Sequence, residues 1–252
     1  MPIERLSIEL TNRCSKHCAF CYNHSYPSGD TSWTPDELVN FVSDCVKHGT
    51  KAVSLGGGEP LEYPGLFEVL QRLRGVLFRS VTSNGLLLEK HLENLIAASP
   101  DKVHISIHFP EQHQEVQRVI NQVKQLESVG IRSGVNLIVP RSKLIAVSEA
   151  ALKLSQAGID NSRIVFLPMR GTDTPTPQEI SFVAGKQPFQ SMSCLAVCQR
   201  SPRFCAISWD KQVAWCSYTV ARRPLQALTA DALEEALKDL PLIFCGGTKE
   251  EN

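Results

Sequence analysis

Three cysteines lie close together near the start of the chain, in the stretch TNRCSKHCAFCYN at residues 11–23. Cys14, Cys18 and Cys21 have the spacing C-x3-C-x2-C, which in a reducing compartment indicates metal binding rather than a disulfide framework. Three thiolates supply three ligands of a tetrahedral zinc site, or they bind three irons of a 4Fe–4S cluster and leave the fourth iron open. His17 could complete a zinc site, although its place beside Cys18 gives it poor reach to the metal. Three buried cysteines without a ligand are the simplest alternative.

The composition excludes several classes of partner. The 26 Lys and Arg residues equal the 26 Asp and Glu residues, so no overall field draws the chain to nucleic acid or to an anionic membrane. The first ten residues, MPIERLSIEL, lack the apolar core of a signal peptide, and no apolar run approaches the roughly 20 residues of a membrane span. We therefore expect a cytoplasmic protein with neither nucleic acid nor membrane as a partner.

Strand and helix patterns alternate regularly through the first two thirds of the chain, as in folds with parallel strands and right-handed crossovers. Thr34, Pro35 and Glu37 form a capping box that predicts a helix ending at Gly49. The alternation fits both a doubly wound sheet and an open or closed barrel. Strands are expected at 3–10, 51–60, 76–85, 102–109, 132–139 and 162–171, and helices at 34–49, 66–74, 87–99, 114–130 and 144–158.

Ligands of such folds gather at the carboxyl ends of the strands. The cysteine loop follows the first predicted strand, and GGGEP, TSNG and HFP follow the second, third and fourth. The alternation stops after Gly171. Residues 172–193 are expected to form a connection, residues 203–218 two short strands about a turn at Asp210 and Lys211, and residues 229–240 a helix capped by Thr229. The tail at 248–252 is expected to be disordered.

Taken together, these motifs resemble the radical S-adenosylmethionine (SAM) enzymes. The resemblance covers residues 3–170 and includes CSKHCAFC, GGGEP, TSNG, HISIHF and VNLIV in order. It implies a partial (β/α)6 TIM-like barrel and a 4Fe–4S cluster whose fourth iron is chelated by SAM. An electron from the cluster would cleave SAM to a 5′-deoxyadenosyl radical that removes a hydrogen atom from a substrate. A reducing partner of the flavodoxin or ferredoxin type is implied as the electron donor.

The same resemblance assigns roles to residues at the strand ends. It implies that Gly57, Gly58 and Glu59 hold the methionine amino group of SAM. The adenine would be bordered by Phe20 and Tyr22, and further cofactor contacts, to the ribose and methionine groups among others, are implied for Ser83, Ser106 and Asn136. The alternative for Glu59 is a solvated loop carboxylate. The three polar residues could equally be ordinary strand ends.

Five further cysteines lie in the last quarter of the chain: Cys194, Cys198, Cys205, Cys216 and Cys245. Their arrangement about the predicted hairpin resembles the twitch domain, a short relative of the SPASM domain that carries an auxiliary 4Fe–4S cluster. The resemblance implies Cys198, Cys216 and Cys245 as ligands, with Cys205 as the fourth and Cys194 as its substitute. A zinc knuckle and, for Cys205, a buried core thiol are the alternatives.

The twitch resemblance has one departure, because the family's glycine five residues before the second cysteine is replaced by Lys211. The expected domains are a radical SAM barrel at 1–171, the connection at 172–193 and a twitch-like hairpin and helix at 194–247. Cys45 shares a helical face with Leu38, Phe41 and Val42, so we expect it to be structural.

Two residues near the strand ends are candidates for acid–base or substrate-binding roles. His104 and His108 lie four residues apart on one strand face, and His108 is nearer the expected ligand end. Arg170 follows the sixth strand and could bind a substrate carboxylate or hydroxyl. Alternatively, His108 is an ordinary hydrogen-bonded histidine and Arg170 a surface arginine.

The favoured function is a radical SAM oxidoreductase that acts on a small molecule and uses the auxiliary cluster to accept an electron. A maturase of ribosomal peptides and a glycyl-radical activase are the alternative enzymes. An iron–sulfur or zinc protein for binding or electron transfer is the non-enzymatic alternative.

Overall fold

The computed structural model describes residues 2–191, 195, 201 and 203–243 of the chain. These residues form two compact units. Among the described residues, the first unit combines residues 2–103 with residues 201 and 203–243, and the second comprises residues 104–191 and 195. Cys194, Cys198, Cys245 and the tail at 248–252 lie outside the described residues, so the expectations made for them stay predictions.

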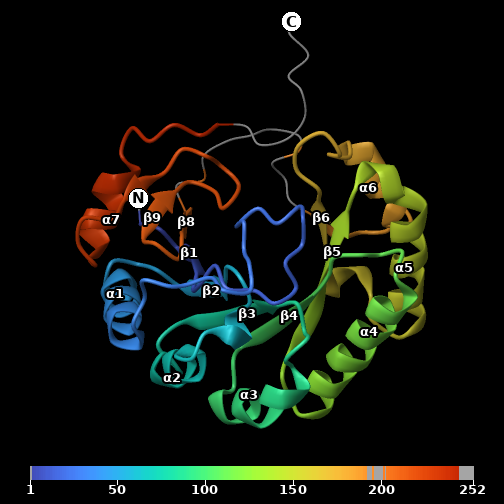
Figure 1. Ribbon diagram of the computed structural model, residues 1–252, viewed down its shortest axis with the longest axis horizontal. Coiled ribbons are helices and arrows are strands. Elements are labelled where there is room, and N and C mark those ends of the chain that lie inside the picture. Colours follow the sequence, from blue (N-terminus) through green and yellow to red (C-terminus); the bar gives the residue numbers. More distant parts are fainter. Residues whose placement is uncertain (1, 192–194, 196–200, 202, 244–252) are drawn as a thin grey trace, which may run out of the picture. The chain divides into compact units, whose positions relative to one another are not determined.

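The first unit is built on a mostly parallel sheet in the order β10-β9-β8-β1-β2-β3 (Figure 1). Strand β1 lies between β2 and β8 and is parallel to both, whereas β9 and β10 continue the sheet in antiparallel pairings. Its strands are β1 (Arg5–Glu9), β2 (Ala52–Gly56), β3 (Phe78–Ser83), β8 (Phe204–Ile207), β9 (Gln212–Ala214) and β10 (Arg223–Pro224).

Four α-helices belong to this unit: α1 (Pro35–Lys47), α2 (Leu66–Arg72), α3 (Leu92–Ala98) and α7 (Ala230–Leu237). The capping box of α1 is confirmed, since Thr34 Oγ1 accepts a hydrogen bond from the Glu37 amide at 3.2 Å and Glu37 accepts one from the Thr34 amide at 3.0 Å. Thr229 caps α7 as expected.

The two faces of β1 have different characters. Leu6 and Ile8 are fully buried on one face, while Ser7 and Glu9 lie on the other. The buried face of α1 carries Leu38, Phe41, Val42 and Cys45, so Cys45 is part of the core as expected. The apolar core therefore lies on the Leu6 side, and the polar strand ends lie on the opposite side.

The second unit contains three parallel strands in the order β5-β6-β7. Strand β4 (Lys102–Ile107) begins in the first unit and ends in the second. The other elements are β5 (Ser133–Val139), β6 (Ile164–Pro168), β7 (Gln190–Ser191), α4 (His113–Ser128), α5 (Leu144–Gln156) and α6 (Pro177–Val183).

The expected α/β class with mostly parallel strands is confirmed, but the last third of the chain differs from expectation in two ways. The stretch 172–193 is more than a connection, because Thr176 and Glu179 form a second capping box and Ile180 and Val183 bury one side of α6. Strand β8 pairs with β1, so the hairpin extends the sheet of the first unit and does not stand apart from it.

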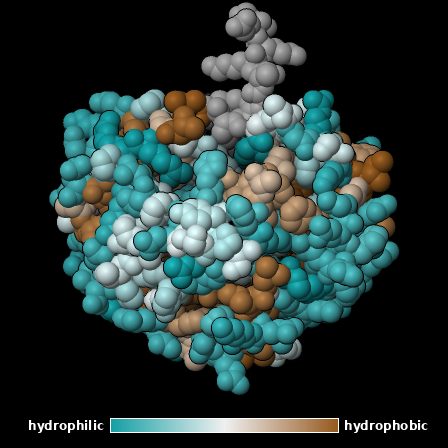
Figure 2. All heavy atoms as spheres, viewed as in Figure 1, coloured by the Kyte–Doolittle hydropathy of each residue, from teal (hydrophilic) through white to brown (hydrophobic). Residues whose placement is uncertain are grey.

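The face of the molecule in Figure 2 is mainly hydrophilic. In the face shown in Figure 2, hydrophobic side chains appear in separate small groups among hydrophilic ones. No helix within the described part of the chain is long and apolar enough to cross a membrane.

The turn between β8 and β9 explains the departure at Lys211. This residue has φ +63°, a left-handed conformation that favours glycine. Its Nζ atom lies 2.9 Å from Glu37 Oε1 and 5.2 Å from the centre of the Trp33 ring. Lys211 thus adopts the left-handed backbone conformation of the turn, and its side chain adds contacts to the start of α1.

We expect Lys211→Val to lower the free energy of unfolding by about 1–3 kcal/mol, because a β-branched side chain disfavours positive φ and the contacts with Glu37 and Trp33 are lost. Lys211→Asn loses the same contacts but tolerates the backbone, and should cost less than about 1 kcal/mol. Urea unfolding measures both values. Equal losses in the two variants would show that the side-chain contacts, and not the backbone, govern this turn.

Candidate functional site

The cysteine loop begins after β1. The two segments at its base, residues 11–14 and 26–30, are joined by hydrogen bonds and are called the stem. Tyr26 donates its backbone amide to the Asn12 carbonyl at 3.0 Å, and Cys14 donates to the Tyr26 carbonyl at 3.0 Å. The Asn12 side chain accepts a hydrogen bond from the Asp30 amide at 2.6 Å. Gly29 packs against the stem so tightly that a Cβ atom there would lie 2.5 Å from the backbone of Asn12 and Arg13. The stem therefore holds the three cysteines on one closed loop.

Cys14, Cys18 and Cys21 are reduced thiols, each partly buried. A turn brings the Cys21 amide to the Cys18 carbonyl at 3.0 Å. His17 and His24 have φ of +44° and +48°, so the loop holds strained backbone on both sides of Cys18 and Cys21. Within the described residues, no three histidine, cysteine or acidic side chains already form a metal-binding group. Three thiols on one loop are nonetheless the donor set that a cluster with one open iron requires.

The glycines of GGGEP are packed directly on the stem. Gly58 donates its amide to the Thr11 carbonyl at 2.5 Å, and the Glu59 amide donates to the Arg13 carbonyl at 2.8 Å. A Cβ atom on Gly58 would overlap the Arg13 carbonyl oxygen. Gly57 has φ +100°, and a Cβ atom there would lie 2.7 Å from Glu9 Cα. Both positions require glycine, and the cysteine loop and the glycine loop form one continuous hydrogen-bonded structure.

The Glu59 side chain ties the glycine loop to the TSNG turn. The carboxylate accepts hydrogen bonds from the Leu61 amide at 3.0 Å, from Ser83 Oγ at 2.7 Å and from the Asn84 amide at 2.7 Å. It is 1% exposed, so the alternative of a solvated loop carboxylate is wrong. Burial raises the pKa of Glu59 to about 7, and the hydrogen bonds from Asn84, Ser83 and Leu61 oppose a further rise.

Asn84 is a site residue that the sequence analysis did not single out, although it lies in the TSNG motif. Its side-chain amide lies 3.5 Å from Cys14 Sγ and donates to it, while its carbonyl oxygen accepts from the Leu86 amide at 2.8 Å. A donor at this distance favours a thiolate over a thiol. Asn84 therefore connects the third strand end to the first cysteine.

The two aromatic residues of the loop lie beside the thiols. Tyr22 packs its ring against that of Tyr218, with centroids 4.9 Å apart and planes tilted by 55°. Phe20 is half-buried. The expected contact of both rings with adenine stays a prediction.

The second unit carries the other four predicted site residues. Ser106 on β4 and Asn136 on β5 are buried, and Asn136 Oδ1 lies 2.9 Å from His104 Nδ1. His108 follows β4, and its backbone amide donates to Glu115 Oε1 at 2.6 Å. Arg170 follows β6 and is half-buried. The ligand-binding and acid–base roles of these residues stay predictions.

Comparison with known proteins agrees with this geometry. The model of the Radical SAM superfamily matches residues 8–173. The chain belongs to this superfamily. The family's cofactors, a 4Fe–4S cluster and SAM, accordingly fit the three thiols and the glycine loop described above.

The curated relatives of this radical SAM chain include probable GTP 3′,8-cyclases. The protein of Methanocaldococcus jannaschii is 31% identical over 140 residues, which cover 51% of this chain and 47% of the relative. That of Sulfolobus acidocaldarius is 29% identical over 176 residues, covering 66% and 56%. The chain thus spans about half the length of these relatives.

Solved structures with a similar fold are more distant in sequence. Streptococcus suis SuiB bound to the precursor peptide SuiA has a TM-score of 0.74 at 13% identity, covering 92% of this chain and 64% of SuiB. The enzyme anSMEcpe with bound AdoMet has a TM-score of 0.64 at 14% identity, covering 94% and 80%. These likenesses establish the partial barrel of radical SAM proteins with added antiparallel strands.

The described cysteines in the last quarter of the chain lie in different surroundings. Cys205 is completely buried in β8 and pairs in register with Leu6, on the side of the sheet that faces Cys45. Burial raises its pKa well above that of an ordinary thiol. This position fits the alternative of a core thiol. Cys216, by contrast, follows β9 and is half-buried.

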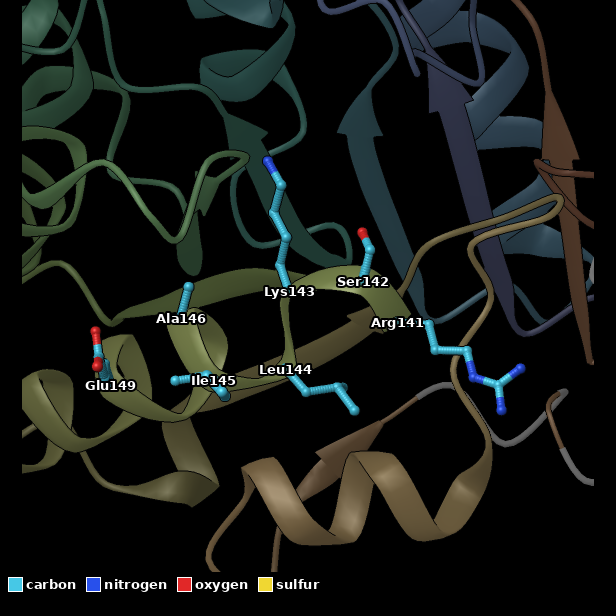
Figure 3. Close-up of a pocket in the computed structure, with 7 residues that line it drawn as sticks. All are labelled: Arg141, Ser142, Lys143, Leu144, Ile145, Ala146 and Glu149. Carbon is cyan, nitrogen blue, oxygen red and sulfur yellow. The ribbon is translucent and has the colours of Figure 1, made fainter.

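A hollow of about 480 Å³ at the start of α5 contains none of the predicted site residues (Figure 3). Three of its charged and polar residues have partners. Arg141 pairs with Glu179 at 3.0 Å, Ser142 donates its amide and its hydroxyl to the Asp173 carboxylate, and Lys143 pairs with Glu111. The two cations that line the hollow, Arg141 and Lys143, are therefore already paired with carboxylates.

We expect Gly58→Ala to lower the free energy of unfolding by at least about 2 kcal/mol, because the new methyl group meets the Arg13 carbonyl. The displaced stem should also lower the iron bound after reconstitution. Gly56→Ala is the matched control, since a Cβ atom on Gly56 meets nothing within 4 Å. Thermal unfolding and iron analysis check both variants, and equal behaviour would contradict the packing described here.

Proposed function

We propose that this protein reductively cleaves SAM and uses the resulting radical to remove a hydrogen atom from a substrate. The observation that carries the proposal is the joining of the cysteine loop, Gly58 and Glu59 into one hydrogen-bonded structure at the end of β1. A cluster held by three thiolates, with SAM on its fourth iron, would supply the electron and the 5′-deoxyadenosyl radical.

The chain's own residues would bind and orient these cofactors. Cys14, Cys18 and Cys21 would hold the cluster as thiolates, and the Asn84 amide would stabilise the charge on the Cys14 sulfur. Gly57 and Gly58 let the glycine loop pack directly against the backbone of Glu9 and Arg13, which fixes the path of the loop that would hold SAM. The Glu59 carboxylate accepts hydrogen bonds from Leu61, Ser83 and Asn84, so its part would be to fix the loop that holds SAM.

The reaction we favour is the oxidation of a small molecule with the help of an auxiliary cluster. The antiparallel hairpin of β8 and β9 with helix α7 supports a twitch-like segment, and half-buried Cys216 follows that hairpin. Cys205 faces the core, so we propose Cys194 in its place as the fourth ligand beside Cys198, Cys216 and Cys245.

Peptide modification is the second candidate. The likeness to SuiB bound to its precursor peptide supports it, because the fold covers 92% of this chain. A ribosomal peptide that binds tightly to the purified protein would favour this candidate over a small substrate.

The central test is anaerobic reconstitution followed by reduction and addition of SAM. We expect 5′-deoxyadenosine and about eight irons per chain, falling to about four irons and no 5′-deoxyadenosine when Cys14, Cys18 and Cys21 are all replaced by alanine. A protein that binds zinc, stays colourless and yields no 5′-deoxyadenosine would overturn the proposal.

The auxiliary ligands are separated by single substitutions. Cys194→Ala should remove about four irons and Cys205→Ala should leave the iron content unchanged, because only a cluster ligand affects cluster loading. Iron analysis with a visible absorption spectrum measures both. Loss of iron in Cys205→Ala alone would restore Cys205 as the fourth ligand.

A further inference from the structure

Glu9 is a buried carboxylate that accepts no hydrogen bond from the described residues and has only a long ion pair with Arg222. It is the last residue of β1, directly before the cysteine loop, and it is 1% exposed. Both carboxylate oxygens are buried, and neither accepts a hydrogen bond from any residue that the structure describes. The nearest cation is Arg222, whose Nη2 lies 3.7 Å from Glu9 Oε1, beyond hydrogen-bond distance. Since buried carboxylates are normally hydrogen-bonded, Glu9 requires an explanation.

Arg222 also has a buried polar atom that forms no hydrogen bond with the described residues. Its Nη2 donates to the Ser217 carbonyl at 2.8 Å, which fixes the guanidinium. Its Nη1 is buried and donates to none of the described residues. The pair therefore presents two unused acceptor oxygens beside one unused donor.

The surroundings place this pair next to the cofactor loops. The backbone of Glu9 is in contact with Gly57, where an added Cβ atom would lie 2.7 Å from Glu9 Cα. Tyr22 is close enough that, after desolvation, the Glu9 charge is the next cause that raises its pKa. Burial also raises the pKa of Glu9 to about 7, with Asp210 adding to the rise and Arg222 opposing it.

The unused groups restrict the chemistry of a ligand. An ammonium group would satisfy Glu9 and be repelled by Arg222, whereas a carboxylate would satisfy Arg222 and be repelled by Glu9. A carboxamide offers an N–H donor beside a carbonyl acceptor and carries no charge, so it can satisfy both residues at once. A hydroxyl also combines a donor with an acceptor, but it has a single hydrogen, whereas a primary carboxamide has two N–H donors for the two carboxylate oxygens.

We propose that Glu9 and Arg222 form an anchor for a carboxamide group of the substrate, with its N–H donating to Glu9 and its carbonyl accepting from Arg222. The anchor would present the substrate beside the glycine loop and Tyr22. Its part in catalysis rests on the proposed function, but the binding of an amide does not. A primary amide and the edge of guanine, whose lactam N–H lies beside an amino group, share this chemistry.

Binding of small probes to the reconstituted protein in the presence of SAM tests the anchor. N-acetylglycinamide represents the open amide, guanosine the lactam, and ethylammonium and propionate the charged competitors. We expect at least one amide probe to bind more than tenfold tighter than either charged probe, as measured by saturation-transfer NMR titration. Binding of N-acetylglycinamide alone would assign an open amide, and binding of guanosine alone a lactam.

Substitutions decide whether the pair itself is responsible. Glu9→Gln and Arg222→Gln should each weaken the bound amide probe more than tenfold, while Glu89→Gln, an exposed carboxylate without an ion pair in the described structure, should leave it unchanged. The melting temperature separates binding from folding. It should fall by less than about 5 °C in Glu9→Gln, because the ion pair with Arg222 at 3.7 Å is lost but no hydrogen bond with the described residues is.

Three results would overturn the anchor. They are equal binding of amide and charged probes, probe binding that Glu9→Gln leaves unchanged, and a melting temperature that falls by more than 5 °C in Glu9→Gln, which would indicate a structural ion pair. Failure of the wild-type protein to bind iron or cleave SAM would instead contradict the proposed function. The two failures are therefore distinguishable.

Discussion

The contact between the glycine loop and the stem of the cysteine loop is the constraint on which the site depends. Gly58 approaches the Arg13 carbonyl so closely that no side chain fits, and its amide is bonded to Thr11. Two neighbouring parallel strands thus end in loops that share hydrogen bonds. Glu59 and Asn84 extend this connection to the third strand. The thiols and the glycine backbone consequently occupy fixed positions relative to each other before any ligand binds.

Two buried carboxylates in the first unit, those of Glu59 and Glu9, differ in their hydrogen-bond partners. Glu59 accepts hydrogen bonds from three donors, so its carboxylate is already bonded within the fold. Glu9 lies at the end of the adjacent strand, equally buried, and receives no hydrogen bond from the described residues. Burial raises the pKa of both to about 7, so the pKa alone does not separate them. The hydrogen-bond partners do, and they point to Glu9 as the group with capacity for a ligand.

Local features were predictable from the sequence, whereas pairings between distant segments were not. The helix caps at Thr34 and Thr229 depend on residues within one turn, and both are confirmed. Helix α6 was missed because three prolines and many polar residues masked its capping box at Thr176. The pairing of β8 with β1 joins residues about 200 positions apart, and no local pattern reports it. That register, in turn, decides that Cys205 faces the core.

The pairing of β8 with β1 also determines which segments of the first unit lie beside the cysteine loop. Strand β1 carries the cysteine loop, and the hairpin beside it is bonded to the end of that loop, where Ser32 donates to the Trp209 carbonyl and Trp33 to the Ser208 carbonyl. The segment after the hairpin supplies Tyr218 against Tyr22 and Arg222 against Glu9. The cysteine loop, the glycine loop and the TSNG turn therefore come from the first three strand ends, and the C-terminal segment contributes Tyr218 and Arg222 beside them. Under the proposed function, a change of sequence in the C-terminal segment would alter the bound substrate while these loops keep their geometry.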